Sequence, residues 1–500
     1  MSATKLIIAN YSAMQNKGYG EADLTSVQEA LTRLVKSDQD RGITTTVVDL
    51  SNRAKMAQYD APVVTDEKDE KQNKDAIDAV FRSAEPDYLM LLGSHDVIPH
   101  QHLTNLASDD DPSVPSDLPY ACEVTYDAAG QEPSKFTNPS RVVGRLPDVT
   151  GSHDPSYLVH LIKYSAAATS VQREAYQSYF GLSAAVWHKS TETNLTDIFG
   201  NANALHLIPP DDSPWPAKSL AARSHFVNCH GASRDPNWYG EGNGGFPVAL
   251  KANDVNQPLT SGTILAAECC YGAELYQPNI PTGMPICNTY LDSGAVLFFG
   301  STNIAYGPAD HCDKADLISR YVIRETLQGQ SSGYATLKAR LDYVKGKSHL
   351  DPVDLKTLSQ FILLGDPSVR PVGLPKLATE ETDAHAAMTE RRHEAKRIAH
   401  VLEQGISVPQ PVPSSYRSAA LEEQLHSITA RHGLPPSASI SSFAVTWRSE
   451  AAVPKGLGRP PRQHLLHAVR SSDAPVRTDI IVIVREQDDR IVSVEEYEAR

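Results

Sequence analysis

Two short segments end in residues that can act together as a nucleophile and a base. The first runs from Ser224 to Gly231 and ends in Cys-His-Gly, and the second runs from Thr263 to Gly272 and ends in Glu-Cys-Cys-Tyr-Gly. A cysteine attacks as its thiolate, so it needs a nearby base or positive potential to lower its pKa. A histidine can take the thiol proton and later give it to a leaving amine near neutral pH. The two segments therefore indicate acyl transfer at a cysteine.

The same segments indicate how a fold would bring these side chains together. Each begins with an apolar run that is typical of a buried strand in a parallel sheet. The carboxyl ends of neighbouring parallel strands meet at one edge of the sheet, where ligand sites usually form. We expect His230 to share a crevice there with Cys269 or Cys270. The backbone amides of Gly231 and Cys270 would then form an oxyanion hole for a scissile carbonyl group.

Alternating strand-like and helix-like segments frame this pair of motifs. Before it we expect strands over Lys5–Asn10, Thr44–Leu50 and Asp87–Gly93 and helices over Leu24–Lys36 and Lys71–Ser83. Further along we expect strands over His225–Cys229, Thr263–Cys269 and Ala295–Gly300 and helices near Asp316–Gln328, Tyr334–Lys345 and Leu355–Phe361. This alternation predicts an α/β fold with a mainly parallel sheet flanked by helices, built as one continuous domain or as two side-by-side subdomains.

The chain of 500 residues is too long for one hydrophobic core. We expect an N-terminal α/β subdomain over residues 1–170 and a catalytic α/β subdomain over residues 171–374. The remainder, residues 375–500, reads as a charged helix over Thr379–Gln404, a linker over Val408–Ser415 and a small α+β domain. This C-terminal part would regulate the protein, recruit partners or only stabilise it.

Composition narrows the range of partners. The net charge of −15 would repel nucleic acids and anionic membranes, and we expect neither as a partner. The first apolar run is too short for a signal peptide and no stretch is long enough to span a bilayer, so we expect a cytoplasmic protein. Six cysteines without C-x-x-C spacing indicate reduced thiols, and we expect no metal and no cofactor.

The motifs resemble those of clan CD cysteine peptidases, which have the caspase–hemoglobinase fold, and in particular the gingipain-like, prokaryotic caspase-like branch. His230-Gly231 is similar to the His-Gly motif of these enzymes, and Glu268–Gly272 resembles the Gln-Ala-Cys-Arg-Gly box of caspases. The gingipain-like character rests on other stretches, among them Leu91–Pro99, Val143–Pro147 and Leu364–Ser368. The similarity extends over about residues 1–372 and implies a cysteine endopeptidase whose partners are protein or peptide substrates.

Two adjacent cysteines leave two choices for the nucleophile. The resemblance implies an acid two positions before it, which selects Cys270, whereas a Cys-x-x-Gly spacing selects Cys269. Neighbouring residues of a strand point to opposite faces, so only one thiol enters the crevice. We predict Cys270, with Cys269 as the alternative.

Two acidic residues are candidates for substrate binding. The resemblance implies that Glu268 borders the pocket for the residue before the cleaved bond, where a carboxylate would favour arginine or lysine. Asp117, in the long loop after the third expected strand, is the second candidate. The alternative for Glu268 is a structural role, such as pairing with a lysine or capping a backbone amide.

The expected reaction passes through an acyl-enzyme that His230 helps water to hydrolyse. Unregulated proteolysis inside a cell would be harmful, so we expect a latent enzyme that cleavage, a ligand, an activating protein or a protease switches on. Two other functions remain open. One is a non-catalytic scaffold that retains the fold, and the other is a thiol transpeptidase in which an amine replaces water.

Overall fold

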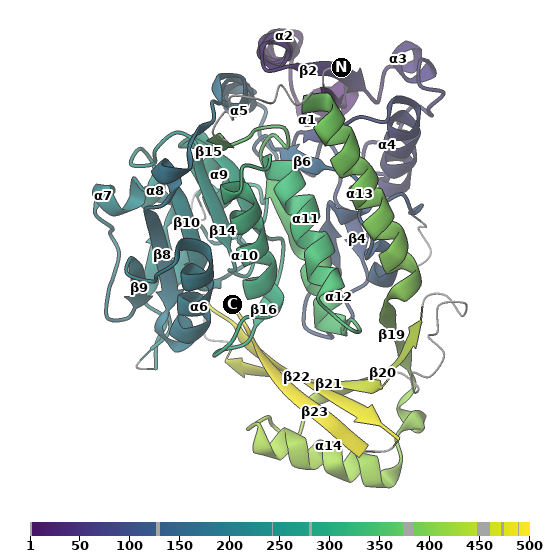
Figure 1. Ribbon diagram of the computed structural model, residues 1–500, viewed down its shortest axis with the longest axis vertical. Helices are drawn as coiled ribbons and strands as arrows, with labels where there is room; N and C mark the ends of the chain where they lie inside the picture. The colour runs from purple at the N-terminus through teal and green to yellow at the C-terminus, as the bar shows by residue number, and fades with distance from the viewer. Residues whose placement is uncertain are drawn as a thin grey trace.

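A ten-stranded sheet forms the centre of the protein in its computed structural model (Figure 1). The structure describes residues 3–126, 131–242, 244–279, 283–373, 384–447, 461–471, 475–488 and 490–500. The strand order in this sheet is β2-β1-β3-β6-β17-β15-β14-β10-β8-β9. Helices flank it, so the expected α/β class with a mainly parallel sheet is confirmed.

The N-terminal part of the chain supplies one side of the sheet. Its strands are β1 (Ala3–Ala9), β2 (Ile43–Asp49), β3 (Tyr88–Leu92), β4 (Gln101–Leu103), β5 (Val114–Ser116) and β6 (Val143–Leu146). Its helices are α1 (Tyr11–Lys17), α2 (Glu21–Asp40), α3 (Arg53–Ala57), α4 (Glu70–Ala84), η1 (Leu118–Ala121), η2 (Pro133–Phe136) and α5 (Ser156–Ala167). The strands β4 and β5 pair with each other, outside the large sheet.

The middle of the chain supplies the other side. Its strands are β7 (Val171–Gln172), β8 (Tyr179–Ala184), β9 (Leu205–Ile208), β10 (Ser224–Asn228), β11 (His230–Gly231), β12 (Asn237–Tyr239), β13 (Val248–Lys251), β14 (Thr263–Ala267), β15 (Ala295–Ser301), β16 (Tyr306–Gly307), β17 (Phe361–Leu364) and β18 (Val372–Gly373). Its helices are η3 (Arg173–Tyr176), η4 (Ala185–Trp187), α6 (His188–Phe199), α7 (Ala217–Leu220), α8 (Ala252–Val255), α9 (Ile286–Asp292), α10 (Lys314–Leu327), α11 (Ser332–Lys345) and α12 (Pro352–Gln360).

The direction of the strands reverses once within the large sheet. The strands β15 and β17 pair antiparallel, with Ser301 beside Phe361, whereas the other neighbours in this sheet run parallel. The carboxyl ends of β14 and β10 therefore lie at the opposite edge of the sheet from the carboxyl ends of β1 and β3. The sheet is continuous across residue 170, where two subdomains were one of the expected arrangements.

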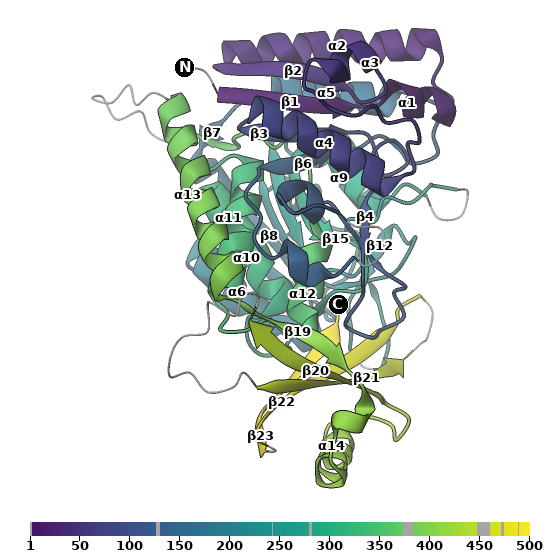
Figure 2. The ribbon, with the colours of Figure 1, turned by 90° about the vertical axis from the view of Figure 1, so that its right-hand side faces the viewer.

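The C-terminal part of the chain forms a second, antiparallel sheet. It contains α13 (Ala384–Gly405), β19 (Ser407–Val412), η5 (Ser414–Tyr416), α14 (Ala419–Arg431), β20 (Ser439–Trp447), β21 (Arg462–Ser471), β22 (Thr478–Gln487) and β23 (Arg490–Ala499). The strand order is β16-β23-β22-β21-β20-β19, so β16 of the middle segment extends this sheet. The sheet lies at the opposite end of the molecule from α2, β1 and β2 (Figure 2). Among the described helices, none is both long and apolar enough to cross a membrane.

The second sheet shares a hydrophobic core with the first unit. Ile483 and Tyr497 of its strands belong to the same buried cluster as Ile318 of α10 and Leu355 of α12. On its other side, α14 packs against β22 through a separate cluster that includes Leu425. The C-terminal sheet is therefore held against α10 and α12 by buried apolar contacts.

Several expected elements differ from those found. The linker over Val408–Ser415 lies largely in β19, which pairs with β20, and the helix predicted over Leu355–Phe361 ends at Gln360 before β17. Asp351 and Asp354 cap each other's backbone amides at the start of that helix, with Pro352 in its first turn, which explains why it begins there. The strand β8 was not expected at all. Residues 379–383 of the helix predicted over Thr379–Gln404 lie outside the described residues.

Candidate active site

His230 and Cys270 follow adjacent parallel strands at the same edge of the sheet. The strands β10 and β14 pair in register, with Val227 beside Ala267, and each of the two candidate residues comes three positions after this pair. A side chain on Gly231 would collide with this arrangement, because a Cβ atom there would lie 1.8 Å from the carbonyl oxygen of Cys270. Glycine at position 231 thus permits the close approach of the two loops.

The amides of Gly231 and Cys270 converge on one oxygen atom. Both donate to the carbonyl oxygen of Arg500, at N···O distances of 3.4 Å and 3.1 Å. The amide of Arg500 donates in turn to the carbonyl oxygen of Ala305, at 2.9 Å. The structure therefore brings together the two amides that were expected to form an oxyanion hole. Arg500, which directly follows β23, occupies the space in front of them.

The imidazole of His230 has one nitrogen engaged and one free. Its Nε2 lies 2.8 Å from Glu241 Oε2, while Nδ1 is buried and has no hydrogen-bond partner. The hairpin formed by β11 and β12 pairs His230 with Tyr239 and so returns the chain to place Glu241 nearby. Burial lowers the pKa of His230, opposed by the Glu241 carboxylate. A neutral ring that donates from Nε2 carries its lone pair on Nδ1, which is the atom available as a base.

The two cysteines lie in different parts of the core. Cys269 is completely buried in the cluster that holds Cys229 and Tyr290, and burial raises its pKa well above the usual value. Cys270 belongs to the other large cluster and is 2% exposed. Its Sγ accepts a hydrogen bond from the amide of Ala305 at 3.2 Å, and burial raises its pKa to about 12. Of the two, Cys270 is the cysteine whose amide faces the Arg500 carbonyl group.

A tight turn follows Cys270. Tyr271 has a φ of 55°, in the left-handed region that non-glycine residues rarely adopt. Its amide donates to the carbonyl oxygen of Asn303 at 3.0 Å, and its hydroxyl group donates to Asp111 at 2.9 Å. Asp111 also forms an ion pair with Lys356 of α12 at 2.7 Å. Strained backbone of this kind persists where its surroundings hold it, and it clusters at functional sites.

The side chain of Arg500 is completely buried in a pocket next to these amides. Its Nη2 donates to Asp316 Oδ2 at 2.8 Å and to the carbonyl oxygen of Pro308 at 2.7 Å. Its guanidinium group stacks on Trp187, 4.3 Å from the ring centroid. A Cβ atom on Gly307 would lie 2.3 Å from Arg500 Nη2, so only glycine leaves room for this side chain.

Glu268 is completely buried near Asp316 and makes no hydrogen bond to Arg500. Asn194 Nδ2 lies 3.3 Å from Glu268 Oε1 and 3.5 Å from Asp316 Oδ1, and so connects the two carboxyl groups. Burial and the neighbouring Asp316 charge raise the pKa of Glu268 well above its usual range. Burial also raises the pKa of Asp316, against the attraction of Arg500, and Asp316 is the carboxyl group that contacts the Arg500 guanidinium group.

Asp117, the second expected substrate-binding residue, is placed elsewhere. It receives two hydrogen bonds from the buried guanidinium group of Arg145, at 2.8 Å and 2.6 Å, and lies 2.9 Å from His100 Nδ1. Arg145 lowers the pKa of Asp117, whose carboxylate is fully engaged. The reason is the reversal of the sheet, because Asp117 packs near the carboxyl end of β3 and not near that of β14. This geometry gives Asp117 a structural role and no contact with the Arg500 pocket.

The reasoning from sequence missed four residues of this site. Trp187 follows β8 and lies between the Arg500 guanidinium group and the His230 ring, whose centroid is 4.3 Å away. Glu241 and Asp316 come from the hairpin and from the first turn of α10. Arg500 arrives by pairing of β16 with β23, which no local pattern reveals. The local signal for Glu241 in the sequence is its position shortly after His230-Gly231, directly after Tyr239-Gly240.

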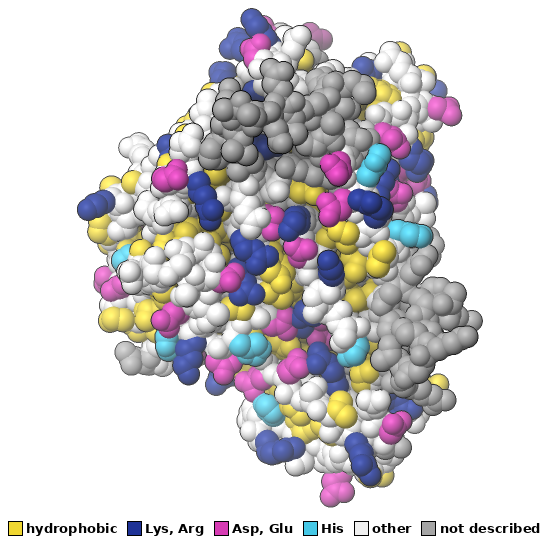
Figure 3. All heavy atoms as spheres, viewed as in Figure 1, with side chains coloured by type: hydrophobic (Ala, Val, Ile, Leu, Met, Phe, Trp, Pro, Cys, Tyr) yellow, Lys and Arg dark blue, Asp and Glu magenta, His cyan; other side chains and the backbone are white. Residues whose placement is uncertain are grey.

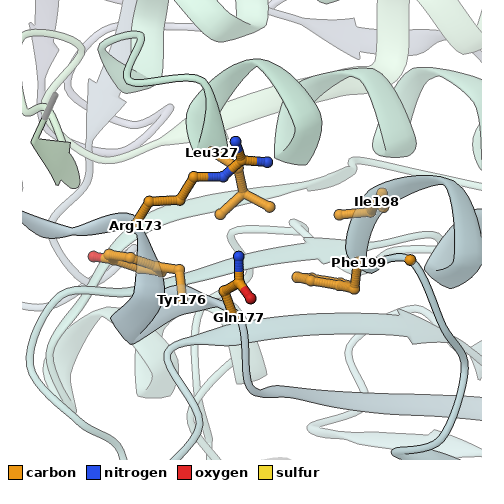
Figure 4. A pocket seen from close by; sticks show the side chains of 7 residues that line it. Arg173, Tyr176, Gln177, Ile198, Phe199 and Leu327 are labelled. Carbon is orange, nitrogen blue, oxygen red and sulfur yellow. The ribbon is translucent and has the colours of Figure 1, made fainter. Parts of the chain in front are cut away.

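A separate pocket of about 250 Å³ lies at the far ends of α6 and α10 (Figure 4). Arg173, Tyr176, Gln177, Ile198, Phe199, Gly200 and Leu327 line it. Asp316 and Trp187 lie at the opposite ends of the same two helices. The lining of this pocket contains no cysteine, histidine or carboxylate, so the pocket offers no nucleophile or general base for acyl transfer. Elsewhere among the described residues, no three histidine, cysteine, aspartate or glutamate side chains are grouped to hold a metal ion.

Comparison with known proteins points to the same part of the chain. Residues 229–372 match the family model described as Peptidase family C25. This match contains His230, Cys270 and Asp316, confirms the resemblance to the gingipain family of clan CD, and supports cysteine-peptidase function. No curated protein matches the sequence.

Solved structures show weaker similarity. A structure of a protease is 12% identical and has a TM-score of 0.46, covering 99% of this chain and 96% of that chain. Two structures of the Saccharomyces cerevisiae separase–securin complex, at 3.0 and 2.6 Å, are 12% identical, with TM-scores of 0.31 and 0.30. Each covers 47% of this chain and 14% of that chain.

Proposed function

We propose that the protein is a cysteine endopeptidase that cleaves after arginine and lysine. The observation that carries this proposal is the position of Arg500, whose carbonyl oxygen accepts from the amides of Gly231 and Cys270 while its side chain contacts Asp316. Donors that converge on a carbonyl oxygen next to a thiol are the arrangement that stabilises a tetrahedral oxyanion. Arg500 thus lies as the residue before a cleaved bond would lie.

In the proposed mechanism, His230 Nδ1 removes the proton from the Cys270 thiol. The Sγ atom first leaves its hydrogen bond with the amide of Ala305 and then attacks the carbonyl carbon, and the two amides hold the developing oxyanion. The C–N bond then breaks, the amine leaves with the proton from His230, and a thioester remains. Water attacks the thioester with His230 as the base, which releases the carboxylate and restores the thiol.

The directions of the pKa shifts support a resting state in which Cys270 is a thiol and His230 is a neutral imidazole. Burial raises the pKa of Cys270 to about 12 and lowers that of His230 below its usual value. A thiol and a neutral imidazole are therefore the forms present near neutral pH while Arg500 fills the site. Glu241, which holds Nε2, fixes the tautomer and stabilises the imidazolium that forms when the proton is transferred.

Selectivity for basic residues rests on a single buried charge. Asp316 is completely buried at the end of the pocket, and Trp187 supplies an aromatic face that favours a guanidinium group. The net charge of −15 adds a long-range attraction for basic peptides. On the face seen in Figure 3, acidic and basic side chains are interspersed.

The test is cleavage of internally quenched peptides that differ only in the residue before the scissile bond. The native chain, Cys270→Ala, Cys269→Ala and His230→Ala are compared, each also with Arg500→Met to empty the pocket of its cation. We expect cleavage after arginine and lysine that disappears in Cys270→Ala and His230→Ala and persists in Cys269→Ala. If only Cys269→Ala loses activity, Cys269 is the nucleophile and the assignment of Cys270 is wrong. Absence of cleavage in every form would contradict the peptidase function, and transfer of the acyl group to added glycinamide in preference to water would indicate a transpeptidase.

A further inference from the structure

Residues 498–499, which directly precede Arg500, pair with β16 as an antiparallel strand. Tyr306 pairs with Ala499 and Gly307 pairs with Glu498, antiparallel, and the amide of Arg500 continues this ladder to Ala305. An extended peptide that adds a strand to a sheet edge is a common mode of peptide recognition. The segment 498–500 therefore uses the backbone groups that a peptide substrate would need.

The side chains of this segment make specific contacts on both sides of the site. Trp187 Nε1 donates to Glu498 Oε2 at 2.7 Å, and the hydroxyl group of Tyr497 donates to Asp313 at 3.2 Å. Lys314 lies 4.7 Å from the centroid of the Tyr497 ring. The segment is thus fixed by several residues besides Arg500, and these contacts define its register on β16.

The occupied site is closed to other molecules. Arg500 is completely buried and Cys270 is 2% exposed, so the thiol is not accessible to a reagent of peptide size. Two guanidinium nitrogens of Arg500, Nε and Nη1, make no hydrogen bond although they are buried. The group pays a desolvation cost there, which limits how tightly the strand is held.

We propose that the strand β23 and Arg500 form an intramolecular inhibitor that occupies the peptidase site as the acyl side of a substrate does. The inhibitor rests on the proposed function, since it fills the same pocket and the same oxyanion hole. Because it belongs to the same chain, its effective concentration is high and a free substrate competes poorly. The active form is the one in which the last residues of β23 have left β16, while the rest of the C-terminal sheet stays packed on α10 and α12.

Opening of the site requires only a local change. The ladder between β16 and β23 has two residue pairs, whereas β23 pairs with β22 over most of its length. Release of 498–500 breaks that short ladder, the amide contacts of Arg500 and its ion pair with Asp316. It also breaks the pairing of Glu498 with Ile480 at the end of β22 and the contacts of the Glu498 side chain with Trp187 and Arg470. Local openings of this size are cheaper than unfolding of the domain. A basic peptide, a partner that binds the released strand, or removal of Arg500 would favour the open form.

Alkylation of Cys270 by iodoacetamide, followed residue by residue by mass spectrometry, tests this proposal without requiring catalysis. The native chain is compared with Arg500→Ala, Arg500→Met and the control Arg490→Ala, an exposed arginine at the start of the same strand. The buried Cys229 and Cys269 serve as internal references. We expect Cys270 to react about tenfold faster or more in both Arg500 variants, because the fraction of open site rises, and to react at the native rate in Arg490→Ala.

Hydrolysis of an arginine peptide by the same four proteins separates the two proposals. We expect both Arg500 variants to hydrolyse it faster than the native chain. Equal alkylation and equal hydrolysis in the native chain and both Arg500 variants would overturn the inhibitor while leaving the peptidase intact. Faster alkylation without hydrolysis in any protein would refute the peptidase and retain Arg500 as the group that covers Cys270.

Discussion

Asp316 Oδ2 accepts a hydrogen bond from Arg500 Nη2 at 2.8 Å, whereas the neighbouring Glu268 makes no hydrogen bond to that side chain. The acid next to the nucleophile in sequence is therefore not the one that contacts the cation. Asp316, far from Cys270 in the sequence, makes that contact. Substitutions of the two carboxyl groups should therefore differ in their effect on arginine binding.

Asp316→Asn is expected to lower kcat/KM for arginine peptides about 100-fold or more, the loss typical of a buried charge pair whose partner is removed. Glu268→Gln is expected to change it by less than about threefold, because Glu268 makes no hydrogen bond to Arg500, burial raises its pKa well above the usual range, and glutamine has the same shape. Both variants are measured in an Arg500→Met background. A large loss in Glu268→Gln with none in Asp316→Asn would reverse the assignment.

Gly307→Ala is expected to exclude arginine from the pocket. The added Cβ atom would lie 2.3–2.6 Å from atoms of Arg500 and Asp316, so a bound arginine must shift, and a shift of about 1 Å costs about 100-fold in rate. Cleavage after arginine is measured by the release of fluorescence from a quenched peptide. Gly245→Ala is the matched control, since its Cβ atom would meet nothing within 4 Å. Unchanged arginine cleavage in Gly307→Ala would show that substrates bind elsewhere.

Glu241→Ala is expected to shift the acid limb of the pH–rate profile to lower pH. His230 must be neutral to accept the thiol proton, so activity is lost as pH falls through its pKa, which burial holds below the usual value. The Glu241 carboxylate raises that pKa, and its removal lowers it further. The rate at the plateau should fall about tenfold or more because the tautomer is no longer fixed. Glu241→Gln, whose amide oxygen still accepts from Nε2, should recover most of the plateau rate; an unchanged profile in Glu241→Ala would argue against this role.

A peptide tag added after Arg500 is expected to be released by the chain itself. The carbonyl group of Arg500 already faces the oxyanion donors, so the bond that follows it would be placed for attack by Cys270. Release is followed by intact-protein mass spectrometry at several protein concentrations, and a rate independent of concentration identifies cleavage within one molecule. The tag should persist in Cys270→Ala and in Arg500→Gln. A tag that is stable on the otherwise native chain would contradict the placement of this carbonyl group.

Asp117→Asn is expected to destabilise the fold without changing the preference for basic residues. The substitution leaves the buried guanidinium group of Arg145 without its counter-charge, which costs about 3 kcal/mol. Urea denaturation measures this loss. Cleavage of peptides that end in arginine and lysine, measured on the folded fraction in the Arg500→Met background, should keep the same ratio. A changed ratio at native stability would restore the substrate-binding role predicted from sequence.

The sequence was sufficient to predict that His230 and Cys270 follow strands that end at one edge of the sheet, and insufficient to predict the pocket around Arg500. Apolar runs that end in His-Gly and in Cys-Cys are local patterns, and parallel strands bring their ends together whatever the rest of the chain does. The meeting of Arg500 with Asp316 of α10 depends instead on the pairing of β16 with β23, which joins residues 306 and 499 and has no local signature. The misplacement of Asp117 has a similar cause, because the antiparallel pairing of β15 and β17 cannot be read from alternation of strands and helices.

The short ladder between β16 and β23 also restricts which proteins could be cleaved. A target that replaces Arg500 must offer its arginine in an extended segment of at least the three residues that 498–500 now contribute. Helices and the inner strands of folded domains have their backbone groups already engaged, so they could enter only after local unfolding. The choice of target would then depend as much on how easily a region unfolds locally as on its sequence, and flexible loops and interdomain segments would be cut first.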